Sequence, residues 1–422
     1  MEMTRVQLAQ GVNLTYLPAR KFKTSLLSAQ FVTPLRQETA GANALLAAVL
    51  RRGTVSCPDM GALSARMDNL YDASIDYTVR KKGENQCVGF VASFIDDRYA
   101  PGGEHLLEPV AELLGELVCD PVTYHGRFVP EYFDSEKSNL LEAIRSIIND
   151  KRDWADSRLL RTLCAGEPYA VPRLGDEETV DKLQALRVYD QYRQLISTAP
   201  LEIIYSGSAD LERVRLALAA AFATLPREEV RMISAAVPHV GRETVQYVED
   251  ALDVTQGKLG MGFSCGSSDM PALLMGNTLF GGSSNSKLFL NVREKLSLCY
   301  YASSLYHRQK GLITVSSGIE FQNYQRAYDE IMAQLEAVQK GELEDWELEG
   351  ARSTLLNSYA TVGDSQGKLE NFYLGQVATG QTEPPEALAR AIETMTADRI
   401  CQAMETVRLD TVYFLKGKEV EA

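Results

Sequence analysis

An approximate internal repeat constrains this chain most, because it places the same succession of segments in both halves of the 422 residues. The segment ALLAAVLRRGT (44–54) aligns with ALLMGNTLFGG (272–282), so that Gly53 falls on Gly281. Farther on, LYDASIDYTVRKKG (70–83) aligns with CYYASSLYHRQKG (299–311), and a strand-like apolar run follows each. The repeat predicts two homologous domains. The length agrees, since one hydrophobic core rarely serves more than about 250–300 residues.

The elements expected in each half predict the fold class. Alternating apolar runs such as GVNLTYLP and SLLSAQFVT predict strands before the repeated helix, and two more strands are expected after a second helix near Met60 to Leu70. A pair of long helices is expected up to Gly166, with Asp134 or Ser135 as the N-cap. We therefore predict an α+β fold of two homologous domains, each a mostly antiparallel sheet covered by helices on one face. The expected N-terminal domain, linker and C-terminal domain are 1–225, 226–239 and 240–422.

Composition and charge exclude several classes of function. The formal net charge of −14 and a pI near 5.0 oppose binding to a phosphate backbone, so no nucleic-acid partner is expected. The first residues lack a basic segment followed by an apolar region, and no apolar run has the length of a membrane span. We expect a cytoplasmic protein with no membrane partner. Seven dispersed cysteines without a C-x-x-C pair favour reduced thiols over disulfides or a cysteine zinc site.

Residues that carry metal or nucleophile chemistry are sparse. The four histidines, His105, His125, His239 and His307, have no second histidine or carboxylate at metal-ligand spacing on an evident helix. The first two occupy polar, loop-like segments and His239 occupies the expected linker, so we predict surface positions for them. No G-x-S-x-G elbow is present, and GGSSNSK lacks the phosphate-loop pattern. The residues by themselves indicate a protein without its own reactive group.

The helix NALLAAVLRRGT carries three alanines whose spacing is informative. Ala44, Ala47 and Ala48 stand at i, i+3 and i+4, which places them on one helix face. Alanine has the highest helix propensity, so simple structural filling is one explanation. The stretch also resembles the zinc-binding helix of the insulinase/pitrilysin metallopeptidases, the inverzincins, in which H-x-x-E-H ends shortly before a GT pair. Counted back from that pair, the resemblance assigns the two histidines to Ala44 and Ala48 and the general-base glutamate to Ala47.

The last zinc ligand of that family is a glutamate on a later helix, seven residues after another glutamate. Starting from Glu136, this position falls on Ala143, with Glu142 one place early. A shift of one residue turns a helical side chain by about 100°, so Glu142 is predicted to point away. The resemblance therefore implies no metal site in this chain.

Other motifs of the family are retained. The segment GEPYAVPRLG resembles the family's hPYg…lG segment, and SKLFLNVREKLSLCYYASS resembles its signature SRLfxxvREkxgLaYxv. The resemblance assigns catalytic roles to Arg293 and Tyr300, which in active members grip a substrate carbonyl and stabilise the oxyanion. A solvated arginine and a half-buried strand tyrosine are the alternative. GGSSNS coincides with a glycine-rich substrate-handling loop of the family's non-catalytic processing subunits, although a helix-to-helix turn is equally consistent. Its candidate substrate-binding residues are Gly281, Gly282, Ser283 and Ser284.

In two-chain members of the family, one protomer supplies H-x-x-E-H and the other supplies the arginine and tyrosine. The resemblance implies a processing-peptidase-like fold and a subunit that is inactive alone. It would form a heterodimer with a zinc-bearing sibling and help it cut short or unfolded peptides, with the zinc in the sibling. A second hypothesis is a non-catalytic scaffold or peptide-binding protein of the same fold. A third, a self-sufficient zinc protease, predicts stoichiometric zinc.

Overall fold

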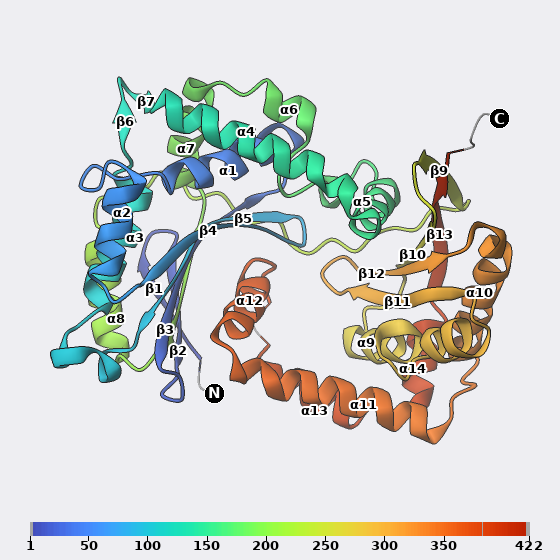
Figure 1. Cartoon of the computed structure of the whole chain (residues 1–422). Helices are drawn as coiled ribbons and strands as arrows, with labels where there is room; N and C mark the ends of the chain where they lie inside the picture. The colour runs from blue at the N-terminus through green and yellow to red at the C-terminus, as the bar shows by residue number, and fades with distance from the viewer. Residues whose placement is uncertain (1–2, 382, 419–422) are drawn as a thin grey trace. The chain divides into compact units, whose positions relative to one another are not determined.

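The computed structural model describes residues 3–381 and 383–418 and divides the chain into two compact units (Figure 1). Both units are discontinuous in sequence, unlike the predicted domains. The first unit consists of Met1–Arg145, Val171–Ala235 and Gly363–Thr382, and the second of Ser146–Ala170, Ala236–Val362 and Glu383–Ala422. The chain passes between the units at residue 235, inside the segment predicted as the linker.

The first unit is built on a six-stranded sheet in the order β1-β2-β8-β3-β5-β4. Strands β2 and β8 are parallel, and all other neighbours are antiparallel. Leu27, Ala29 and Phe31 alternate along β3 and point into the core beneath helices α1, α3 and α7. The strands are β1 (Thr4–Ala9), β2 (Val12–Pro18), β3 (Thr24–Pro34), β4 (Ser74–Lys82), β5 (Asn85–Ile95) and β8 (Leu201–Gly207), and β6 (Thr123–Tyr124) and β7 (Arg127–Phe128) form a separate hairpin. The helices are α1 (Gln37–Leu50), α2 (Met60–Asp68), α3 (Leu107–Cys119), α4 (Pro130–Ser146), α6 (Glu177–Asp181), α7 (Ala185–Thr198), α8 (Leu211–Ala221) and α12 (Gln366–Val377).

The second unit repeats this topology in a five-stranded sheet of order β11-β12-β10-β13-β9. Strand for strand it matches β4-β5-β3-β8-β2 of the first unit, and its parallel pair, β9 with β13, occupies the same place as β2 with β8. The predicted repeat and the antiparallel-rich α+β class are therefore confirmed. The strands are β9 (Gln246–Leu252), β10 (Gly257–Cys265), β11 (Cys299–His307), β12 (Leu312–Ile319) and β13 (Val407–Gly417). The helical elements are α5 (Lys151–Leu163), α9 (Met270–Asn277), η5 (Thr278–Gly282), η6 (Leu288–Lys295), α10 (Tyr324–Gln339), α11 (Asp345–Ala360), α13 (Pro385–Glu393) and α14 (Ala397–Met404).

Each sheet carries one further helix on the face opposite its main helical layer. On the first sheet this helix is α12, whose Glu370 accepts a hydrogen bond of 2.7 Å from Ser28 Oγ, on the face of β3 that points away from the core. Arg80 of β4 also binds Glu370 through two nitrogens, at 2.6 and 2.7 Å. These polar contacts explain why residues 363–381 fold with the first unit.

On the second sheet the corresponding helix is α5. Its Leu159 and Leu163 pack over Gly260 and Gly262 of β10, which alternate with core residues on the other face of that strand. A Cβ added at Gly262 would lie 2.7 Å from Leu163 Cδ2, so the close approach of helix and strand requires glycine there. This packing places residues 146–170 in the second unit. The prediction had helices on one face of each sheet, and the structure adds a helix on the other face.

The start of the helix pair also differs from the prediction. Helix α4 begins at Pro130, four residues before the predicted N-cap Asp134, because proline is preorganised for the first helical position. Helix α5 begins after Asp150, whose carboxylate accepts hydrogen bonds from the backbone N–H groups of Arg152 and Asp153. The predicted stop is observed, since Gly166 lies beyond α5 with a φ of +87°.

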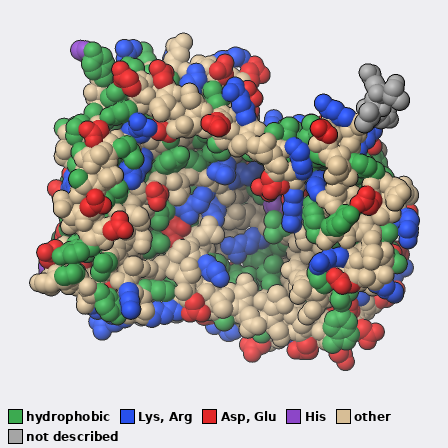
Figure 2. All heavy atoms as spheres, in the orientation of Figure 1, with side chains coloured by type: hydrophobic (Ala, Val, Ile, Leu, Met, Phe, Trp, Pro, Cys, Tyr) green, Lys and Arg blue, Asp and Glu red, His purple; other side chains and the backbone are tan. Residues whose placement is uncertain are grey.

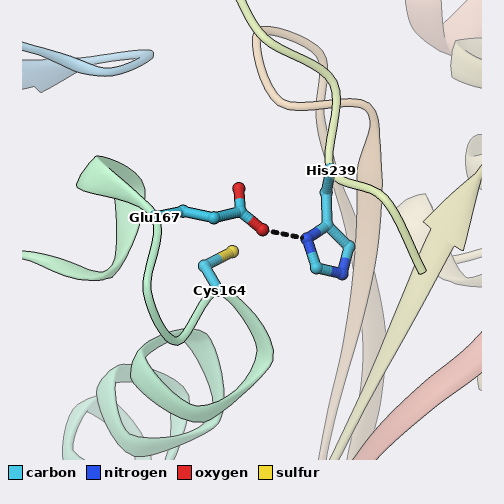
Figure 3. Close-up of side chains that lie close together, drawn as sticks. All are labelled: Cys164, Glu167 and His239. Atoms are coloured by element: carbon cyan, nitrogen blue, oxygen red, sulfur yellow. Dashed lines mark hydrogen bonds and ion pairs between the residues drawn. The ribbon is translucent and has the colours of Figure 1, made fainter. Parts of the chain in front are cut away.

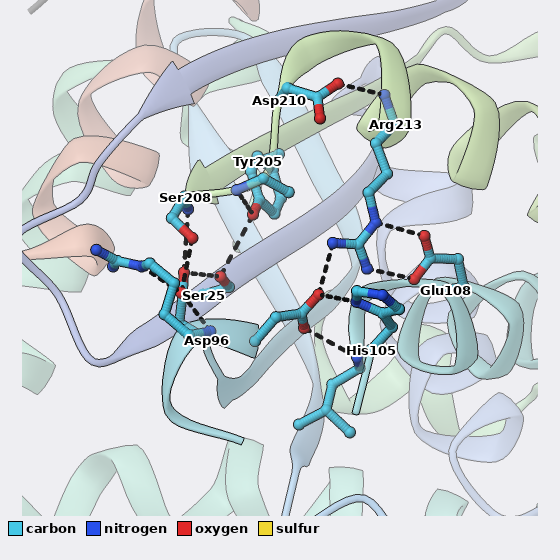
Figure 4. A network of polar contacts seen from close by, with 12 residues as sticks. Ser25, Asp96, His105, Glu108, Tyr205, Ser208, Asp210 and Arg213 are labelled. Carbon is cyan, nitrogen blue, oxygen red and sulfur yellow. Dashed lines mark hydrogen bonds and ion pairs between the residues drawn. The ribbon is translucent and has the colours of Figure 1, made fainter. Parts of the chain in front are cut away.

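A polar network fixes the end of β5 in the first unit (Figure 4). The buried Asp96 carboxylate accepts hydrogen bonds from Ser208 Oγ at 2.6 Å, Arg98 Nε at 2.8 Å and Ser25 Oγ at 3.1 Å. Burial by itself raises the pKa of Asp96, but the hydrogen bonds from Ser208 and Arg98 outweigh it and hold the pKa below its ordinary value. The network ties together β3, the segment after β5 and the segment after β8.

On the face drawn in Figure 2, both acidic and basic side chains reach the surface of each unit. Among the described residues, no helix combines the length and the apolar character that crossing a bilayer requires.

Candidate functional site

The face of α1 that corresponds to the zinc ligands lines an open pocket of the first unit. Ala44 and Ala48 line it from α1 and Ala143 lines it from α4, and the pocket has a volume of about 740 Å³. Glu142 is not among the described residues of this lining, so the predicted helix register is confirmed. Ala47 instead lines a small apolar cavity of the core. Ala44, Ala48 and Ala143, at the three ligand positions, therefore line one pocket, whereas Ala47, at the position of the general base, does not.

The residues of this pocket do not fit zinc. Methyl groups at the three ligand positions offer no donor atom, whereas zinc in proteins takes three or four nitrogen, sulfur or oxygen ligands. The carboxylate of Glu136 lines the pocket, but its Oε1 already binds Arg52 Nη1 at 2.8 Å. Arg52 also stacks on the Tyr132 ring, 4.9 Å from its centroid. No catalytic step through zinc follows from this pocket.

Basic side chains supply most of the remaining charge of the pocket. Arg80, Lys81 and Lys82 line it from β4, and Arg173 lines it from the segment before α6. Arg80 is held by Glu370, and Lys82 Nζ binds Asn371 Oδ1 at 2.6 Å. The pocket at the positions that correspond to the zinc ligands is therefore basic and lies beside a sheet edge.

The structure brings Arg293 and Tyr300 together in a second open pocket, of about 430 Å³, in the second unit. The Arg293 side chain is 41% exposed, with its guanidinium 4.7 Å from the centre of the Phe289 ring. Tyr300 is 61% exposed, and its hydroxyl donates to Glu320 Oε1 at 2.6 Å. The hydrogen bond to Glu320, and then its charge, raise the pKa of Tyr300, so the phenol stays protonated and can donate at neutral pH.

A strained turn returns the chain from Arg293 to Tyr300. Arg293 lies in η6 and Tyr300 near the start of β11, and Ser297 between them has a φ of +50°, where the family signature has glycine. The Leu298 N–H closes the turn by donating to the Val292 carbonyl at 3.0 Å. Left-handed backbone at a non-glycine residue is costly and often marks functional sites.

Glu320 is a pocket residue that sequence reasoning missed. In the antiparallel pair of β11 with β12, Cys299 lies opposite Ile319 and Tyr301 lies opposite Gly318, so Tyr300 is the extra residue of a bulge in β11. Regular antiparallel pairing would not bring Tyr300 to Glu320, so the sequence offered no signal for their contact.

The glycine-rich segment closes the turn between η5 and η6. Gly281 is buried, and a Cβ there would lie 2.7 Å from Leu288 Cδ1 and from the Ser304 nitrogen. At Gly282 a Cβ would lie 2.9 Å from Asn277 Nδ2. Close packing therefore accounts for both glycines. Substrate binding by Gly281, Gly282, Ser283 and Ser284 stays a prediction.

Both pockets adjoin the edge of a sheet. Strand β4 ends the first sheet and β11 ends the second, and among the described residues no strand pairs with their outer sides. An unpaired strand edge offers backbone donors and acceptors to an extended peptide.

One histidine prediction is wrong. His105 and His125 are exposed as predicted, but His239 is only 5% exposed. Its ring lies between the carboxylates of Glu167 and Asp410, at 2.5 and 3.3 Å. Its position in a proline-containing linker gave no sign of these partners, which come from distant parts of the sequence.

Comparisons with known proteins agree with this arrangement. A family model described as "Peptidase M16 inactive domain" matches residues 182–355. A Bacillus subtilis (strain 168) protein described as "Probable inactive metalloprotease YmfF" is 34% identical over 415 residues, covering 97% of this chain and 96% of that protein. This chain belongs to the M16 peptidase family. The family predicted from the motifs, insulinase/pitrilysin, is thereby confirmed.

Solved structures also resemble this M16 chain over its full length. A conserved protein from Enterococcus faecalis V583 superposes with a TM-score of 0.90 at 27% identity, covering 100% of both chains. An M16 inactive domain from Pseudomonas fluorescens gives 0.81 at 16% identity, also over 100% of both chains, which supports the fold alone. Alanine at all three ligand positions gives a physical reason why an M16 chain would be inactive.

Proposed function

We propose that this chain is the non-catalytic subunit of a heterodimeric zinc peptidase. It presents Arg293 and Tyr300 to a peptide held at the zinc site of an H-x-x-E-H sibling. One observation carries the proposal: the family's substrate-contacting pair shares an open pocket, while the three ligand positions hold only methyl groups.

The chemistry of the pair suits an oxyanion. The protonated Tyr300 hydroxyl and the Arg293 guanidinium are both hydrogen-bond donors, and preorganised donors stabilise charge that develops on a carbonyl oxygen. The hydroxyl rests on Glu320, so a substrate oxygen replaces that acceptor when peptide binds. Arg293 has its ring contact with Phe289 and a 3.5 Å ion pair with Glu294, and its exposure leaves it able to reach a substrate.

The expected substrate is a short or unfolded peptide in extended form. Strand addition to an open sheet edge supplies sequence-independent main-chain hydrogen bonds. Edge strand β11 begins at the Arg293 pocket, and edge strand β4 lines the basic pocket. Only a peptide with an extended, unpaired backbone can add to such an edge, so segments inside a folded domain are not expected to be substrates.

Steady-state kinetics of the reconstituted pair tests the proposal. Tyr300→Phe removes one oxyanion donor and is expected to lower kcat by about 10²–10³-fold with little change in KM. Arg293→Ala is expected to lower kcat/KM further, because it also removes ground-state binding. Tyr247→Phe and Arg326→Ala, exposed residues of the same unit outside the pocket, serve as matched controls. Unchanged kinetics in folded Tyr300→Phe and Arg293→Ala would favour the scaffold or peptide-binding hypothesis.

A further inference from the structure

A second cluster of metal-ligating side chains lies in the second unit, apart from both pockets. The side chains of Cys164, Glu167 and His239 converge (Figure 3), and their sulfur, oxygen and nitrogen atoms lie within 4.8 Å of one another. Cys164 follows the last turn of α5, Glu167 stands three residues on, and His239 comes from the segment leading to β9. The cysteine and the histidine are buried, which shields the cluster from water.

The histidine of this cluster is oriented as a metal ligand. His239 Nε2 lies 3.3 Å from Asp410 Oδ2, and Nδ1 points to Glu167 Oε1. Asp410 is itself fixed by the Arg242 backbone N–H at 2.7 Å and by the Arg242 guanidinium. Ligating histidines typically donate their second ring N–H to such a carboxylate, which sets the tautomer and leaves the other nitrogen for the metal.

Charged side chains of both signs surround the cluster. Lys310, 1% exposed, binds the second carboxylate oxygen of Glu167, and Arg242 offsets Asp410. A divalent ion that binds Cys164 as the thiolate adds only one net positive charge, because the thiol proton leaves as the ion enters.

We propose that Cys164, Glu167 and His239 bind one divalent ion of the zinc class, with Asp410 and Lys310 as the outer hydrogen-bonding partners. Thiolate and imidazole ligands favour zinc over magnesium or calcium, which prefer oxygen. Three protein ligands leave a fourth position for water. The ion would tie the segment that enters the second unit to the end of α5, a structural role separate from the alanine-lined pocket of the first unit.

Metal titration of the full-length chain tests this site. After chelation and dialysis, the wild type is expected to bind one equivalent of Zn²⁺ and to release a proton as the Cys164 thiol becomes a thiolate ligand. Co²⁺ in its place should give a thiolate-to-cobalt charge-transfer absorption. Zn²⁺ should raise the melting temperature and Mg²⁺ should not.

Variants separate this site from adventitious binding. Cys164→Ser should abolish the cobalt–thiolate absorption, and Asp410→Asn should weaken Zn²⁺ binding about 10–100-fold. Cys265→Ser, at a buried cysteine of the same unit, is the matched control and should bind as the wild type does. The proposal is overturned if the wild type binds less than one equivalent, or if Cys164→Ser and Cys265→Ser bind Zn²⁺ alike. Where a variant fails to fold, Co²⁺ uptake by the wild type without a thiolate-to-cobalt absorption overturns the proposal.

Discussion

Substitution of Gly262 by alanine tests how α5 is seated on the second sheet. The added Cβ would lie 2.7, 3.1 and 3.3 Å from three carbons of Leu163, whereas carbon atoms pack best at about 3.5–4.0 Å. The helix or the leucine must therefore move by about 1 Å. Overpacking of this kind costs about 1–3 kcal/mol, and the reduced freedom of the unfolded chain returns about 0.4–1 kcal/mol. We expect Gly262→Ala to lower the free energy of unfolding by about 1–2 kcal/mol.

The neighbouring Gly260 provides a matched control. A Cβ there would lie 3.2 Å from Leu159 Cδ2, so a shift of a few tenths of an ångström relieves the contact. Gly260→Ala should then change the free energy of unfolding by less than about 0.5 kcal/mol, because the two effects nearly cancel.

Urea unfolding followed by tryptophan fluorescence suits this measurement. Both tryptophans of the chain lie in the second unit, Trp154 in α5 against the sheet and Trp346 in α11, where it is 54% exposed. Trp346→Phe leaves Trp154 as the reporter of helix docking. In a Leu163→Ala background the penalty of Gly262→Ala should vanish, giving a coupling of at least about 1 kcal/mol. Equal stability of Gly262→Ala and wild type, with no coupling to Leu163, would refute the packing described for α5.

Three further predictions concern stability. Glu370→Gln should lower the free energy of unfolding of the first unit by about 2 kcal/mol in urea. This is less than the cost typical of fully buried ion pairs, because the Arg80 side chain is 22% exposed. An unchanged urea midpoint would contradict the docking of α12 on the first sheet. The pKa of Asp96 is lowered on folding, so its charged form stabilises the protein above its unfolded pKa of about 3.9, and this is lost as pH falls through the folded pKa. The stability gap between wild type and Asp96→Asn should therefore be present at neutral pH and shrink in acid, and a gap independent of pH would exclude this role. Ser297→Gly should raise the free energy of unfolding by up to about 1 kcal/mol in thermal melts, because glycine adopts a φ of +50° without the steric cost that serine has there; part of the gain is offset by the greater entropy of the unfolded chain. Ser297→Ala keeps the Cβ and should give no gain in the same melts.

Much of the fold could be predicted because the two halves that are similar in sequence also share one strand order. Two halves with the same succession of apolar runs produced the same strand order in both units. The periodicity of a helix does not indicate on which sheet it packs. The sequence therefore did not predict that α5, from the N-terminal half, packs on the second sheet, or that α12, from the C-terminal half, packs on the first. The glycines alternating in GKLGMGFSCG were the one available signal, since they leave room for a helix on that face.

The candidate site was predictable where helix geometry or a family motif fixed the register. Ala143 was placed correctly because one residue of helix shifts a side chain by about 100°. His239 was misplaced because its partners Glu167 and Asp410 stand far from it in sequence. Burial of that kind depends on tertiary contacts, which spacing within one segment does not report.

A mixing experiment tests the central claim most directly. The zinc-bearing sibling is assayed for peptide cleavage alone, with this chain, and with the folded double variant Arg293→Ala/Tyr300→Phe. The proposed division of roles predicts slow cleavage by the sibling alone, a gain of about 10²-fold or more with the wild-type chain, and loss of that gain with the double variant. Equal rates with the wild-type chain and the double variant would contradict it.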